Sequence, residues 1–335
     1  MRKTIRIASL IIAVCLGLAN NASSAAKLDE ITVNIVAGVE SNAILHIGQE
    51  KGIFEKYGLR VNLLISNNRI AALESGSAQF SLGSVSDMTV RTYLAGSDIR
   101  IIASLDERLD YRLVAHKDVL RNGLKGQTVI VPFALTQIVG IAAKITAESL
   151  GLDSEKDLNY VSVPSFPDVT LYLVNGRAKV GMLNAVYAYK ALRANPNLMV
   201  FAEFNREYPL SSVAAKESYL RANPDATKRF LMAIAETLVY FKNNEAETKK
   251  LIADKFGHKD PDLINLIYDY YKKTMGARLN LHPKSHLLEV AREFVMRSQP
   301  QATSIDVSRL INRSFLDELE NNGFLPNLRL QQGGN

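Results

Sequence analysis

The chain has one cysteine, Cys15, and it lies in a stretch that we predict to be removed from the mature protein. A chain without cysteine forms no disulfide and offers no thiolate to a metal or a substrate, so packing must stabilise it. We also find no Gly-rich phosphate-binding motif, no Gly-x-Ser-x-Gly motif and no paired metal motif. His282 and His286 lie four residues apart, but Pro283 separates them and no cysteine or nearby carboxylate completes a zinc set. The sequence therefore predicts no catalytic residue, no metal site and no cofactor.

The net charge of the chain is also small. The full chain has 40 Lys and Arg residues against 34 Asp and Glu, a net charge of +6. Three of the basic residues, Arg2, Lys3 and Arg6, lie among the first 26 residues, which hold no acidic residue, so the remainder carries about +3. A charge this close to neutrality predicts no nucleic-acid partner.

The first 26 residues have the pattern of a cleavable signal peptide. A basic start is followed by the apolar run Ile7–Leu18 and by small residues up to Ala25 and Ala26, near which we place the cleavage. The run holds about a dozen residues, fewer than the roughly 20 that span a bilayer as a helix. A lipoprotein signal is disfavoured because Val14 precedes Cys15 where a small residue is required. We therefore expect an exported protein.

Beyond residue 26, about 309 residues remain, enough for two domains, and no long apolar run follows. Strand-like and helix-like segments alternate twice, which favours an α/β fold of two lobes, each a mainly parallel sheet flanked by helices. The predicted strands are 31–37, 59–65, 79–82 and 100–105 in the first series, and 128–131, 160–163, 180–183 and 199–202 in the second.

A short repeat links the two series. Residues 73–80 end a helix at Gly76 and begin a strand, and residues 173–180 repeat the pattern with Gly176. Two lobes of similar construction explain the repeat, but any junction of helix, glycine and strand would resemble it. The match leaves both explanations open.

The C-terminal third is predicted to be helical, over 225–242, 245–256, 261–275, 286–297 and 306–321. We expect these helices to pack on the first lobe. That lobe would comprise residues 27–112 and 210–335, and the second lobe, residues 113–209, would be inserted between them. The two chain crossings, near 112–115 and 203–210, would form a hinge.

The segment from Ala43 to Val61, AILHIGQEKGIFEKYGLRV, resembles the start of the nitrate, sulfonate, taurine and thiamine-pyrimidine type solute-binding proteins of ABC importers. Further matches are Ala71–Gly76, Leu94–Gly96 and Leu124–Val129, in the family's order. The chain departs from the family at Gln79 and Lys179, where an acidic residue is frequent, so the resemblance does not fix the ligand.

The resemblance implies a type II periplasmic-binding-protein fold. Such a protein would capture a small-molecule solute in the inter-lobe cleft, in the periplasm, and deliver it as a monomer to an ABC permease with its ATPase. The alternative is an exported sensor or accessory protein with the same fold. An enzyme is not expected.

Ligands of open α/β sheets bind beyond the carboxyl ends of the strands, where helix N-termini begin. This rule selects loop residues that offer hydrogen bonds, charge or an aromatic face. Each hydrogen-bonding residue could instead cap a helix, each aromatic residue could pack in the core, and the ligand's charge stays open. The candidate ligand-binding residues are Glu40, Ser41, Asn42, Asn67, Arg69, Ser84, Ser86, Arg108, Phe133, Thr136, Gln137, Ser165, Phe166, Asn184 and Tyr187.

Overall fold

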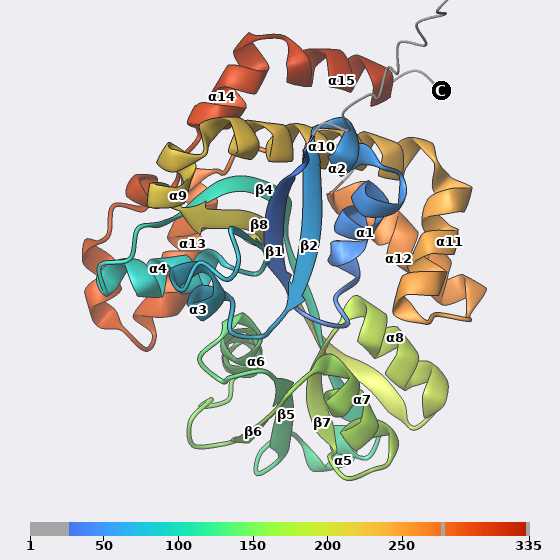
Figure 1. Cartoon of the computed structure of the whole chain (residues 1–335). Helices are drawn as coiled ribbons and strands as arrows, with labels where there is room; N and C mark the ends of the chain where they lie inside the picture. The colour runs from blue at the N-terminus through green and yellow to red at the C-terminus, as the bar shows by residue number, and fades with distance from the viewer. Residues whose placement is uncertain (1–26, 276–278, 333–335) are drawn as a thin grey trace, which may run out of the picture.

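The computed structural model describes residues 27–275 and 279–332 (Figure 1). The predicted signal peptide, residues 1–26, lies outside the described residues. The strands are β1 (Asp29–Ile35), β2 (Leu59–Ile65), β3 (Phe80–Gly83), β4 (Ile99–His116), β5 (Thr128–Pro132), β6 (Asn159–Val163), β7 (Val180–Asn184) and β8 (Leu198–Lys216).

Helices follow most strands and make up the C-terminal third. The α-helices are α1 (Ala43–Glu50), α2 (Ile53–Lys56), α3 (Arg69–Glu74), α4 (Ser86–Leu94), α5 (Val119–Asn122), α6 (Ile138–Ser149), α7 (Phe166–Val174), α8 (Ala185–Ala194), α9 (Glu217–Ala222), α10 (Pro224–Asn243), α11 (Glu245–Phe256), α12 (Pro261–Thr274), α13 (Ser285–Met296), α14 (Ser314–Asn321) and α15 (Phe324–Gln332). Short 3-10 turns are η1 (Glu40–Asn42), η2 (Pro300–Ser304) and η3 (Val307–Leu310). The single helix predicted over 306–321 is therefore divided into η3 and α14.

The strands form one eight-stranded sheet in the order β2-β1-β3-β8-β4-β7-β5-β6. Strand β1 pairs in parallel with β2 and β3, and β5 pairs in parallel with β6 and β7. Between these groups, β4 and β8 are antiparallel to each other and to their outer neighbours. We call β2, β1 and β3 the first end of the sheet, and β7, β5 and β6 the second end.

The expectation of two separate parallel sheets is thus wrong, because β4 and β8 are far longer than predicted. They have 18 and 19 residues and pair from Ile99↔Lys216 to His116↔Leu198. The full length of β4 was not predicted because the sequence of its middle, DERLDYR, has the charged composition of a loop. Its residues nevertheless alternate, with Leu109, Tyr111 and Leu113 buried and Arg108, Asp110 and Arg112 more exposed, which is the period of a strand.

Helices cover both faces of the sheet (Figure 1). At the first end, α3, α4 and α13 lie on one side of the sheet, and α1, α11 and α12 lie on the other. Helix α10 runs across the ends of the strands at the top of the view, below α14 and α15. At the second end, α6 lies on one side, with α7 and α8 on the other. Within the described residues, no helix combines the length and the hydropathy needed to cross a membrane.

The buried residues of α10 have the helical spacing that the sequence predicted. Phe230, Ile234, Leu238 and Phe241 recur every three or four residues and are all buried. The ring of Phe230 stacks on Phe80 of β3 at 4.3 Å between centroids. Each such side chain contributes roughly 1.5–3 kcal/mol by leaving water, so this face fixes α10 against the sheet.

The repeated junction has the same geometry in both places. Gly76 and Gly176 adopt left-handed conformations, with φ of 75° and 67°. Their N–H groups donate to the carbonyls of Leu73 and Leu173, both at 3.1 Å. Because glycine has no Cβ, it takes this conformation without steric cost. The first and second ends therefore share this way of turning from helix to strand.

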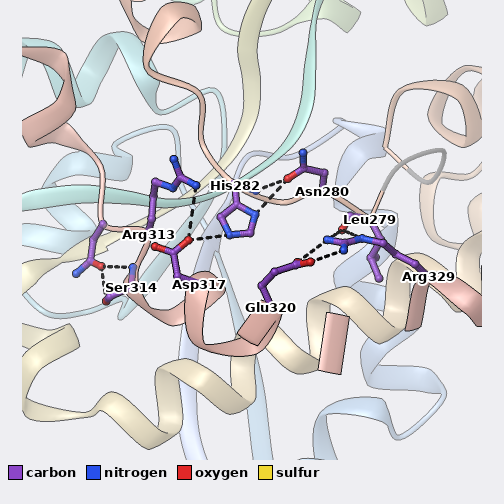
Figure 2. Close-up of polar contacts among 9 residues, drawn as sticks. Leu279, Asn280, His282, Arg313, Ser314, Asp317, Glu320 and Arg329 are labelled. Carbon is purple, nitrogen blue, oxygen red and sulfur yellow. Dashed lines mark hydrogen bonds and ion pairs between the residues drawn. The ribbon is translucent and has the colours of Figure 1, made fainter. Parts of the chain in front are cut away.

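Polar contacts hold the C-terminal helices to the loop that precedes α13 (Figure 2). Arg329 of α15 donates to both carboxylate oxygens of Glu320 at 2.6 Å and to the Leu279 carbonyl at 3.1 and 3.2 Å. The His282 ring lies 3.1 Å from Asp317 and 3.2 Å from Asn280 (Figure 2). Both of its nitrogens are thus occupied. The described residues contain no group of three or more His, Cys, Asp or Glu side chains that could hold a metal ion.

Candidate ligand-binding site

A cavity lies between the two ends of the sheet and takes its lining from both. It offers about 100 Å³ to the centres of water-sized molecules, whereas one water needs roughly 10–15 Å³ by this measure. The space therefore suits a small molecule. The lining comprises Val36, Val39, Ser41, Asn42, Arg69, Leu82, Gly83, Ser84, Asp87, Met88, Asp106, Asp110, Tyr111, Phe133, Gln137, Ile138, Val139, Phe166, Asn184, Ala185, Val186, Leu210, Ser211, Tyr270 and Tyr271.

The first end contributes a buried arginine and a buried aspartate. Arg69 is the first residue of α3, which is capped by the Asn68 side chain accepting a hydrogen bond from the Ala71 N–H. The Nη2 of Arg69 donates to the Ser84 carbonyl at 2.9 Å. Burial lowers the pKa of Arg69, and the charge of Asp87 opposes this effect. Burial likewise raises the pKa of Asp87, and Arg69 opposes that shift. Each charge therefore supports the other in a place that water does not reach.

Several polar atoms of this wall have no partner among the described residues. They are Arg69 Nε, Asp87 Oδ2, Ser84 Oγ and Ser211 Oγ, all on residues that line the cavity. A buried polar group without a hydrogen bond costs about 1–3 kcal/mol. Because these atoms include a donor, an acceptor and two hydroxyls, a ligand that carries both donors and acceptors would remove the cost.

The middle strands add two more carboxylates. Three register shifts interrupt the β4–β8 pairing between Ile101 and Arg108, and Asp106 lies opposite Ser211. Such bulges bend a strand and redirect its side chains. Asp106 is 1% exposed, and its Oδ1 accepts from the Arg108 N–H at 3.1 Å. Burial raises the pKa of Asp106 to about 7.

The second end contributes an aromatic wall. Phe166, the first residue of α7, stacks on Tyr187 at 5.7 Å between centroids and meets Phe133 edge-on at 5.6 Å. Phe133 has a φ of 64°, a conformation that is unfavourable for a bulky side chain. Its N–H donates to the Val163 carbonyl at 2.7 Å, which ties the strained residue to β6. Strain of this kind is concentrated at functional sites.

Side chains join the two ends on both sides of the cavity. On the α8 side, the Tyr187 hydroxyl donates to the Gly38 carbonyl at 3.2 Å, and the Tyr189 hydroxyl donates to Asp260 at 3.3 Å. On the α6 side, Arg91 donates to the Thr136 carbonyl at 2.8 Å, and Arg297 forms an ion pair with Glu148. These contacts hold the ends together around the cavity.

Eight of the fifteen candidate residues line the cavity: Ser41, Asn42, Arg69, Ser84, Phe133, Gln137, Phe166 and Asn184. The other seven do not. Ser86 donates to the Pro209 carbonyl at 2.7 Å, and Ser165 caps α7. Thr136 uses its carbonyl to accept from Arg91, and Tyr187 lies behind Phe166. Asn67 is exposed on a separate shallow surface.

Two of these seven residues, Arg108 and Glu40, are charged, and the contacts of each explain why it does not line the cavity. Arg108 was expected in a loop, but it lies within β4, where its Nε donates to Asn205 of β8 at 2.7 Å. Glu40 is fully buried beside His258, with 3.1 Å between Oε1 and Nε2. Neither charge faces the cavity.

Sequence reasoning missed a group of lining residues, namely Asp106, Asp110, Tyr111, Tyr270 and Tyr271. Asp106 directly follows the predicted strand 100–105, in the loop from which Arg108 was selected, but it was not itself chosen. Asp110 and Tyr111 come from the middle of β4, where the rule of strand ends could not select them. The two tyrosines come from α12, in the C-terminal third. The only available signal was the acidic alternation of β4.

An α/β sheet with a cavity between its ends defines a class of protein that encloses small ligands, and the chain has the periplasmic-binding-protein fold. The family model described as NMT1/THI5 like matches residues 41–248, and the chain belongs to this family. This confirms the family resemblance inferred from the Ala43–Val61 segment.

Individual relatives agree with the family. YtlA of Bacillus subtilis (strain 168) is 25% identical over 314 residues, which cover 89% of this chain and 93% of YtlA. The ligand-binding component of an ABC-type import system from Staphylococcus aureus has a TM-score of 0.67 at 11% identity, covering 87% of this chain and 98% of that one. The alkanesulfonate-binding protein SsuA from Xanthomonas axonopodis pv. citri, bound to MOPS, has a TM-score of 0.66 at 11% identity, covering 86% and 100%.

Proposed function

We propose that this protein is the solute-binding component of an ABC-type importer and works in the periplasm as a monomer. It binds a small molecule without turnover and presents it to a permease that is driven by an ATPase. Family membership supports this function, and the functions of the S. aureus and X. axonopodis proteins are consistent with it.

The observation that carries the proposal is the set of unpartnered buried atoms around the cavity. Arg69 Nε, Asp87 Oδ2 and the hydroxyls of Ser84 and Ser211 would be costly in a cavity with no ligand. The aromatic wall opposite them supplies the apolar contact that small-molecule sites typically combine with a few polar groups.

We further propose that the two ends of the sheet act as two lobes. The first lobe would comprise residues 27–112 and 210–335, and the second residues 113–209, with hinges near 112–115 and 203–210. The β4 bulges suggest that the bending region extends back to Ile101–Arg108. Binding would then shift the population from an open form toward a closed one, in which the four contacts between the ends are made.

The test is a thermal-shift screen of refolded, ligand-free protein against small solutes of different charge. A ligand at about 100 times its dissociation constant adds about 2.7 kcal/mol to the free energy of unfolding. X-ray scattering with and without the bound compound then reports closure as a fall in the radius of gyration. A tightly bound compound that leaves the scattering unchanged would count against hinge closure.

A matched pair of variants locates the binding. Gln137 lines the cavity, and its side chain makes no capping hydrogen bond to α6. We therefore expect Gln137→Ala to weaken binding with little loss of stability. The control is Gln301→Ala, at an exposed position in η2, which should leave both unchanged. Equal effects of the two variants would move the site away from the cavity.

A further inference from the structure

The charges that line the cavity do not balance. One arginine, Arg69, and three aspartates, Asp87, Asp106 and Asp110, belong to the lining. Arg69 and Asp87 support each other's charged forms, and Asp110 forms an ion pair with Arg112. This leaves Asp106, whose carboxylate has no ion pair with any described residue. The cavity therefore carries one uncompensated carboxylate.

Among the described residues, no group that faces Asp106 supplies positive charge. On its own strand it faces Glu107, Asp110 and Tyr111, and from α12 it faces Tyr270, Tyr271 and the hydroxyl of Thr274. The cations nearest to the two acidic neighbours are already used, since Lys284 pairs with Glu107 and Arg112 with Asp110. The surroundings are therefore acidic and aromatic.

A buried hydroxyl opposite Asp106 lacks a hydrogen-bond partner among the described residues. Ser211 lies opposite Asp106 in the β4–β8 pairing, is 2% exposed, and its Oγ makes no hydrogen bond to any described residue. Both residues line the cavity. Carboxylate and hydroxyl oxygens can each accept a hydrogen bond, so the pair offers two acceptors to one ligand group.

On the basis of the proposed function, we infer that the ligand is a small organic cation, whose ammonium group lies beside Asp106 and Ser211 and whose apolar body lies against Phe133 and Phe166. An ammonium group can donate both to the Asp106 carboxylate and to the unpartnered Ser211 hydroxyl, and its charge balances that of Asp106. The faces of Tyr111 and Tyr270 add cation–π attraction. An anion such as a sulfonate would bring a second uncompensated negative charge into the cavity.

The experiment compares benzylamine, benzyl alcohol and benzoate, which share one ring and differ in charge, by isothermal titration of refolded protein. At pH 8 we expect benzylamine to bind at least tenfold more tightly than either of the other two. Below pH 7 its affinity should fall about tenfold for each pH unit, because Asp106 becomes protonated while an aliphatic amine stays charged.

Variants assign the effect to Asp106. Asp106→Asn should remove both the preference for benzylamine and the pH dependence, whereas Asp254→Asn, at an exposed position in α11, should keep both. Ser211→Ala provides a milder test, with an expected loss of roughly threefold to tenfold in benzylamine affinity. Retention of the preference in a folded Asp106→Asn variant overturns the inference.

The outcomes separate this inference from the proposed function. If benzoate or benzyl alcohol binds in the cavity as tightly as benzylamine, or if only neutral or anionic compounds of the broader screen bind, the cation inference is wrong and the solute-binding function stands. If no compound of any charge stabilises the protein or changes its scattering, the proposed function fails, and the cation inference fails with it.

Discussion

The two walls of the cavity differ in kind. All four charged residues of its lining, Arg69, Asp87, Asp106 and Asp110, come from the first end or from β4. The second end contributes aromatic, aliphatic and amide side chains, among them Phe133, and no charged one. In the proposed binding site, one wall would therefore select a ligand by charge and hydrogen bonding, and the other by shape and apolar contact.

This difference suggests an order of events. Charged groups are costly to bury, so they bind a ligand best when their positions are already held by the protein. The Ser84 carbonyl holds Arg69 in this way. Aromatic faces tolerate small changes of position, so they suit the wall that would move. We expect the first wall to capture a ligand and the second to cover it.

The largest effect should come from the charged wall. Arg69→Met removes the larger of the two positive charges that favour the charged form of Asp87, the other being Arg91, and we expect it to cost about 1–3 kcal/mol of stability and to abolish ligand binding. Chemical denaturation measures the cost. Arg121→Met, at an exposed position in α5, is the control. A loss below about 1 kcal/mol would show that the wall is not set by this pair of charges.

Asp106 gives the charged wall a pH dependence. Its pKa is about 7 in the folded protein and 3.8 without burial, so between these values the folded form holds a proton that the unfolded chain releases. The free energy of unfolding of the ligand-free protein should therefore fall as pH rises from about 4 to 7, by up to about 1.4 kcal/mol for each unit, and then level off.

Asp106→Asn should remove this slope and stabilise the ligand-free protein most at pH 8. Denaturation curves of the two proteins across this pH range test it. Parallel curves at every pH would mean that Asp106 is not responsible.

The aromatic wall should respond through backbone strain. A left-handed conformation costs roughly 1–2 kcal/mol for a residue with a Cβ and little for glycine. Phe133→Gly should therefore be more stable than Phe133→Ala by about that amount, which reverses their usual order in a strand. Thermal unfolding of the two variants provides the comparison, and a more stable alanine variant would contradict the strain.

The smallest effects should come from the contacts between the walls. Tyr187→Phe removes the hydrogen bond to the Gly38 carbonyl, worth about 0.5–1.5 kcal/mol, and should favour an open form. Tyr189→Phe removes the 3.3 Å bond to Asp260 and should do less. X-ray scattering of the ligand-free variants measures the opening as a rise in the radius of gyration. If both variants are as compact as the unmodified protein, contacts other than these two must hold the closed form.

The sequence predicted the fold wherever local patterns decided it. All eight strands were located, and the apolar spacing of α10 identified its buried face. It failed for the second half of β4, because Asp106 to Arg112 is charged and becomes a strand through its pairing with β8 and β7. Pairing between distant segments leaves little trace in local composition, so one sheet was taken for two.

The site was predictable for residues at strand ends and not elsewhere. Ser84 directly follows β3 and Asn184 is the last residue of β7, and both line the cavity. Tyr270 comes from α12, whose position depends on tertiary packing, and Asp106 comes from within a bulged strand. Glu40 was placed in the right loop, but its side chain turns to His258 instead.

The pairing of β4 with β8 also bears on how the chain folds. Their contact closest in sequence is His116↔Leu198, on either side of the whole second end, and their most distant is Ile99↔Lys216. Bringing distant residues together costs more chain entropy as the loop between them grows, unless that loop is already compact. We therefore expect residues 117–197 to fold early and the two long strands to pair from His116 toward Ile99, so that the charged wall of the cavity is completed last.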